Sequence, residues 1–85
     1  MKKEEKYIPI SCVYYDLIEH YAVRKETVNI VIQEEEKLVE YHSKILDTKV
    51  KDKVEYMIIA TPNISIRMDL IVSLNGEKLS DFNAC

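Results

Sequence analysis

The sequence has no tryptophan, one glycine, two prolines, two cysteines and no long apolar run. A cysteine metal site needs close pairs such as C-x-x-C, which are absent. Because Cys12 and Cys85 are too few for a disulfide framework, we expect a reducing, cytoplasmic compartment and read Cys12 as a small buried apolar residue. No apolar stretch approaches the ~18 residues of a transmembrane helix, and we expect neither membrane insertion nor a signal peptide.

A basic excess is also missing. The chain has 12 Lys and Arg against 15 Asp and Glu, which gives a formal net charge of -3. Phosphate binding normally needs a basic face, so direct binding of nucleic acid is not expected. Acidic side chains can instead imitate nucleic acid toward a basic partner, although a modest acidic excess also serves solubility alone.

The length sets the size of the core. A chain of 85 residues forms one domain and buries only somewhat over ~60% of its unfolded surface. With 47% hydrophobic and 32% charged residues, the chain has the balance of an ordinary folded domain. We expect a loose tail at residues 1–6, a single domain at residues 7–85, no deep substrate cleft and no enzymatic activity.

A helix is predicted close to the N-terminus. Pro9 disfavours helical backbone just before it, and Ser11 offers an N-cap oxygen for a helix over about residues 12–21. Its apolar stripe is predicted to contain Val13, Leu17 and Tyr21, flanked by Tyr14 and Ile18. Asp16 and Glu19 fall on a different side, three residues apart, where both carboxylates can point to solvent together.

The rest of the chain has the alternating pattern of strands. Strands are predicted at residues 28–33, 37–46, 54–60 and 64–70, and on both sides of the Asn75-Gly76 turn as far as about Phe82. Residues 47–53 are expected to form a polar turn, and Glu34, Glu35 and Glu36 a charged hairpin tip. The order predicts a mainly β fold, with a short N-terminal helix followed by a small antiparallel barrel or half-open roll.

Two pieces of the sequence resemble one known family. Residues 7–19, YIPISCVYYDLIE, match all seven fixed positions of Y-x-P-I-x-C-x-x-Y-D-x-x-E. Further on, Val54-Glu55-Tyr56 and the stretch from Arg67 to Ile71 resemble a V-E-Y and R-x-D-x-I pattern. Both patterns belong to the Rof family of Rho inhibitors, which the chain resembles over roughly residues 7–74.

The resemblance implies an Sm-like barrel that binds transcription termination factor Rho over its primary RNA-binding surface, blocks RNA loading and causes antitermination. On this reading Asp16 and Glu19 are offered to the lysines and arginines of Rho, with Tyr15 beside them. Glu34 and Glu35 supply charge elsewhere, and no cofactor is implied. The two positions after the motif cysteine, often acidic in the family, are Val13 and Tyr14 here.

Several alternatives remain at this point. Asp16 and Glu19 have the spacing of paired hydrolase acids, but nothing predicts a cleft for them. The charged hairpin tip can simply end a strand pair, and His20 and His42 lack the close pairing of a metal site. An Sm-like RNA-binding module, or an interaction module for another basic partner, are the competing functions. Arg67 and Asp69 are expected on one strand face as a structural ion pair worth at most ~1 kcal/mol.

Overall fold

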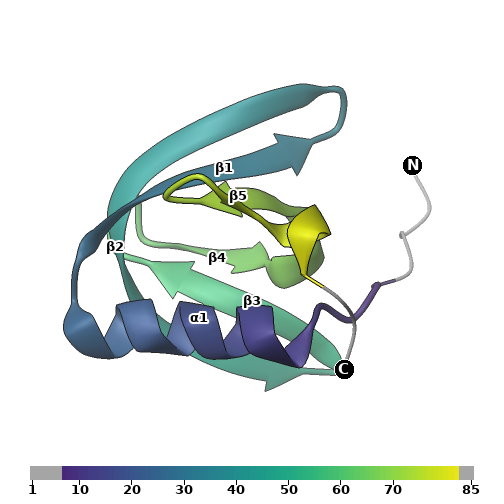
Figure 1. The fold of residues 1–85 in the computed structure, drawn as a ribbon, viewed down its shortest axis with the longest axis horizontal. Coiled ribbons are helices and arrows are strands. Elements are labelled where there is room, and N and C mark those ends of the chain that lie inside the picture. The colour runs from purple at the N-terminus through teal and green to yellow at the C-terminus, as the bar shows by residue number, and fades with distance from the viewer. Residues whose placement is uncertain (1–6, 83–85) are drawn as a thin grey trace.

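The computed structural model describes residues 7–82, and the predicted loose tail, residues 1–6, lies outside them. The elements are α1 (Cys12–Arg24), β1 (Thr27–Glu34), β2 (Lys37–Lys51), β3 (Val54–Ile59), β4 (Ile64–Arg67), the 3-10 helix η1 (Met68–Leu70), β5 (Ile71–Leu74), β6 (Glu77–Lys78) and the 3-10 helix η2 (Leu79–Asp81). The six strands form one antiparallel sheet in the order β4-β3-β2-β1-β5-β6. The predicted mainly β fold is confirmed as a half-open roll, because β4 and β6 remain its edges (Figure 1).

Helix α1 begins where the sequence predicts and runs three residues further. The Ser11 hydroxyl accepts a hydrogen bond from the Val13 backbone N–H at 3.1 Å, as an N-cap does. Nothing between Tyr21 and Arg24 breaks a helix, and α1 ends only where Lys25 turns into the left-handed region, at φ 55°. Tyr21 is buried as predicted, and so are the flanking Tyr14 and Ile18, but the prediction is wrong for Val13, which is 60% exposed.

Strand β2 is longer than predicted and forms the bend of the roll. It pairs with β1 along its first half and with β3 along its second, with an irregular register between Ile45 and Asp47. The expected turn at residues 47–53 is therefore wrong, because the strand continues to Lys51 and only Asp52 and Lys53 make the turn. Both faces of this half are largely exposed, so it carries no apolar alternation that a sequence pattern would detect.

The C-terminal third of the fold differs in detail from the expected strands. The Asn75-Gly76 turn is confirmed, with φ of 51° and 85° as a type I′ hairpin needs, and it joins β5 to β6. The strand predicted over residues 64–70 ends at Arg67, where η1 begins. The last strand is only two residues long, and η2 takes the place of its expected continuation.

The core lies between α1 and the curved sheet. Its buried members are Tyr14, Ile18, Tyr21, Val28, Ile30, Ile32, Ile45, Met57, Ile59, Ile66, Met68, Ile71 and Leu74. In Figure 1 α1 closes the lower end of the roll, opposite the tip of the β1–β2 hairpin, and it packs mainly against β2. Within residues 7–82, no helix has the length and apolar character needed to cross a membrane.

Tyr14 makes the free energy of unfolding depend on pH in the alkaline range. Burial, and then the nearby Glu77 carboxylate, raise the pKa of its phenol well above 10. Above about pH 10 the unfolded tyrosine loses its proton while the folded one keeps it, so the free energy of unfolding falls as pH rises. Urea titrations between pH 8 and 11 measure how steeply the free energy of unfolding falls with pH. We expect this fall to be shallower in Tyr14→Phe than in the unmodified protein, by up to ~1.4 kcal/mol per pH unit. Equal slopes in the two proteins would contradict this.

Candidate functional site

The outer face of α1 carries the residues singled out in the sequence. Asp16 and Glu19 are exposed, as their spacing predicted. Tyr15 is half-buried, and its hydroxyl reaches Thr48 Oγ1 of β2 at 3.3 Å, which ties this face of the helix to the sheet. The two carboxylates therefore stand on a helix anchored at Tyr15.

These residues border one shallow depression between α1 and β3. It has a volume of about 340 Å³ and is lined by Ile10, Cys12, Tyr15, Asp16, Glu19 and Glu55. Three of its six lining residues are carboxylates, and no lysine or arginine is among them. We call it the acidic depression. A cationic group entering it would meet Asp16 and Glu19 from the helix and Glu55 from the sheet.

Residues 7–11 form an extended segment before α1, here called the N-terminal strap. The Tyr7 hydroxyl donates a hydrogen bond to Glu55 Oε1 at 2.5 Å, and the Tyr7 ring lies 5.5 Å from the Arg67 guanidinium carbon. The Ile8 backbone N–H donates to Asp69 Oδ2 at 3.1 Å. Residues 7 and 8, Glu55, and Arg67 with Asp69, which are far apart along the chain, thus meet in one network around the strap.

Arg67 and Asp69 form the centre of this network. Arg67 Nε lies 3.0 Å from Asp69 Oδ1 and Arg67 Nη2 lies 2.6 Å from Asp69 Oδ2, a two-pronged ion pair. The predicted pairing is confirmed, but Asp69 belongs to η1 rather than to a strand face. Its side chain is only 9% exposed, and the pair is therefore more sheltered than the expected surface bridge.

The Tyr7 phenol stays protonated at neutral pH. Partial burial raises its pKa well above the usual 10, and the hydrogen bond to Glu55 raises it further because ionisation would place two negative charges together. The Tyr7 hydroxyl therefore remains a hydrogen-bond donor to Glu55. This keeps the Glu55 carboxylate attached to the strap at the rim of the acidic depression.

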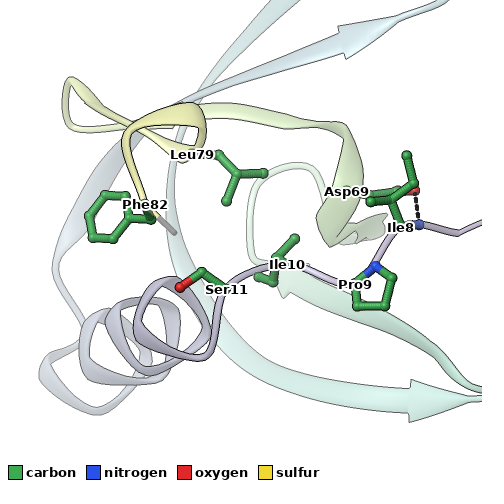
Figure 2. A pocket seen from close by; sticks show the side chains of 7 residues that line it. All are labelled: Ile8, Pro9, Ile10, Ser11, Asp69, Leu79 and Phe82. Atoms are coloured by element: carbon green, nitrogen blue, oxygen red, sulfur yellow. Dashed lines mark hydrogen bonds between the residues drawn. The ribbon is translucent and has the colours of Figure 1, made fainter. Parts of the chain in front are cut away.

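A second depression, with a volume of about 220 Å³, lies along the strap (Figure 2). It is lined by Ile8, Pro9, Ile10, Ser11, Asp69, Leu79 and Phe82. Leu79 and Phe82 give this depression apolar walls (Figure 2), and the only acid among its lining residues, Asp69, is already engaged by Ile8 and Arg67. This apolar hollow does not share the charge of the acidic depression.

Glu34 and Glu35 are not part of the acidic depression. They lie at the tip of the β1–β2 hairpin, which Figure 1 places at the opposite end of the roll from α1. Both are exposed, and the Gln33 side-chain amide donates to the Glu35 carbonyl at 3.0 Å, which braces the turn. The five residues proposed from the sequence thus form two separate groups.

The cysteine and histidines give no further site. Cys12 is exposed and disulfide-bonded, so its interpretation as a small buried residue is wrong, and Cys85 lies outside the described residues. A disulfide also differs from what a reducing compartment predicts. His20 contacts Arg24 on α1 at 3.3 Å, and His42 lies on β2, 3.9 Å from Glu40. In the part of the chain from Tyr7 to Phe82, no three His, Cys, Asp or Glu residues are grouped as metal ligands.

Glu55 is the one lining carboxylate that sequence reasoning did not propose as a contact. The V-E-Y piece includes Glu55, but the sequence predicts only a strand there, because the nearness of Glu55 to α1 depends on the fold of the sheet. Comparison with known proteins adds no further candidate. No protein-family model, no curated protein and no solved structure matches this chain.

Proposed function

We propose that the protein binds transcription termination factor Rho through the acidic face of α1 and blocks RNA loading, giving antitermination. The observation that carries the proposal is that Asp16 and Glu19 are both exposed and line one depression with Tyr15. The Rof-like sequence of the strap and helix supports Rho as the partner. The protein acts by binding rather than catalysis, in the cytoplasm where Rho works.

Competition with RNA follows from the chemistry of the two anions. Lysine and arginine side chains that hold phosphate oxygens also form charge-assisted hydrogen bonds to carboxylate oxygens. A protein that offers Asp16 and Glu19 to those side chains occupies the positions that RNA needs. Since the carboxylates are exposed, salt screens the attraction. The Debye screening length is about 8 Å at physiological ionic strength and about 3 Å at 1 M.

The departure from the family pattern at Val13 and Tyr14 changes the surface less than the sequence suggests. Tyr14 is fully buried in the core, so an acid at that position of this chain would not reach the partner. Only Val13, which is exposed, replaces a family acid at the surface. The exposed face of α1 thus has one acidic side chain fewer than the family pattern, and Asp16 and Glu19 contribute more of the contact.

Displacement of RNA tests the proposal. Fluorescently labelled single-stranded RNA bound to Rho should lose anisotropy as the protein is added, and the effect should weaken between 0.05 and 0.5 M salt, roughly as screening requires. The same RNA titrated with the protein alone should show no binding. RNA bound by the protein alone would favour the Sm-like RNA-binding module instead, and undisturbed Rho–RNA complexes would favour another basic partner.

A further inference from the structure

The strap and the acidic depression are joined at Glu55. Glu55 is the second residue of β3 and is half-buried, so the strand sets its backbone while its carboxylate reaches the wall shared with Asp16 and Glu19. The hydroxyl of Tyr7, 48 residues earlier in the chain, donates a hydrogen bond to Glu55 Oε1 at 2.5 Å. The position of this carboxylate therefore depends on the strap as well as on the sheet.

Tyr7 is itself held by groups other than Glu55. Its ring lies over Arg67, and Arg67 is fixed by its two-pronged pair with Asp69. The next residue of the strap, Ile8, is bonded to that same Asp69 through its backbone N–H. A phenol held from two sides presents its hydroxyl in one direction, which orients the Glu55 carboxylate before any partner arrives.

We propose that Glu55 is a third partner-binding carboxylate and that Tyr7 is its positioning residue, so that one lysine or arginine side chain of the partner inserts into the acidic depression. This inference rests on the proposed function. A carboxylate has two oxygens and several acceptor sites, so Glu55 accepts from Tyr7 and from a cation together. The strap is then part of the binding surface and not only an anchor for α1.

The shape and lining of the depression fit a long cationic side chain. Its volume of about 340 Å³ is at the small end of ligand pockets, which span about 300–1,000 Å³, as insertion of a single side chain requires. Ile10 and Tyr15 give an apolar wall for the methylene stem, while Asp16, Glu19 and Glu55 surround the charged head. An anionic group such as RNA phosphate would be repelled from the same place.

The test compares Glu55→Gln, Tyr7→Phe and the double variant for affinity to purified Rho. Glutamine keeps an acceptor for Tyr7 but removes the charge, and phenylalanine keeps the ring over Arg67 but removes the donor. We expect Glu55→Gln to weaken binding roughly tenfold and Tyr7→Phe roughly threefold. In the Glu55→Gln background, Tyr7→Phe should have no further effect, because there is no charge left to orient.

Two controls separate the possible failures. Glu40→Gln removes an exposed carboxylate on β2 outside the depression and should leave affinity unchanged. If Asp16→Asn weakens binding but Glu55→Gln does not, the proposal that Glu55 contacts the partner is wrong and the proposed function stands. If neither weakens binding, the proposed function itself is wrong. Tyr7→Phe acting equally in both backgrounds would show a merely structural role and overturn its positioning of Glu55.

Discussion

Reversing both helix carboxylates, with Asp16→Lys and Glu19→Lys together, is expected to abolish measurable binding to Rho. If the α1 face binds Rho as proposed, each change removes an attractive pair and places a cation opposite the cations of the partner, and like charges at an interface cost several kcal/mol. We expect affinity to fall at least roughly a hundredfold, or ~3 kcal/mol. Both side chains are exposed, so the free energy of unfolding should change by no more than about 0.5 kcal/mol.

The hairpin tip provides a control with the same change in net charge. Glu34→Lys with Glu35→Lys alters two exposed carboxylates at the opposite end of the roll from α1 (Figure 1). Isothermal calorimetry with Rho should give nearly unchanged affinity for this variant and no detectable heat for the helix variant. Equal losses in both would show that overall charge, or a surface including the tip, carries binding instead of the α1 face.

Removing the Tyr14 side chain is expected to be the most destabilising single change. Tyr14 is fully buried, its ring meets Phe82 edge-on at 4.8 Å, and its hydroxyl donates to the Glu77 carbonyl at 2.8 Å. Truncating a buried aromatic residue costs about 3–5 kcal/mol, since it leaves a cavity as well as lost contacts. For a domain of this size, that is a large part of a total stability of roughly 5–10 kcal/mol.

Val13→Ala is the matched variant next to it on the helix. Val13 was predicted to belong to the buried stripe, yet its side chain is 60% exposed, so truncation should change the free energy of unfolding by less than about 0.5 kcal/mol. Urea unfolding of Tyr14→Ala and Val13→Ala measures both. A large loss of unfolding free energy for Val13→Ala, or a small loss for Tyr14→Ala, would contradict the observed packing. It would mean that Val13, and not Tyr14, faces the sheet.

The error at Val13 shows what local patterns leave open. Two overlapping stripes of apolar residues run along this helix, one through Val13, Leu17 and Tyr21 and the other through Tyr14, Ile18 and Tyr21. Periodicity alone does not choose between them, because both have helical spacing. The choice comes from the C-terminal part of the fold, where Glu77 of β6 and Phe82 after η2 provide partners for the Tyr14 hydroxyl and ring.

Features with strong local chemistry were predictable. Ser11 as the N-cap, the alternation of Val28, Ile30 and Ile32, and the Asn75-Gly76 turn all depend on neighbours within a few residues, and all are confirmed. The second half of β2 was not predictable, because its exposed polar side chains carry no pattern and its strand conformation depends on pairing with β3.

The candidate site was predictable only on its helical side. Spacing alone indicated that Asp16 and Glu19 share a face of α1, and the structure places both at one depression. Glu55 lies 36 residues beyond Glu19 in the sequence and reaches the same depression only because β3 passes beside the helix. Its bond to Tyr7 is likewise a long-range contact that no local pattern contains.

Direct titration of purified Rho with the unmodified protein tests the central claim most simply. At low salt, calorimetry should show saturable binding that competes with single-stranded RNA, weakens as salt rises and disappears in the variant with Asp16→Lys and Glu19→Lys. Absence of binding to Rho at low salt, with the protein folded, would contradict the assignment of Rho as the partner.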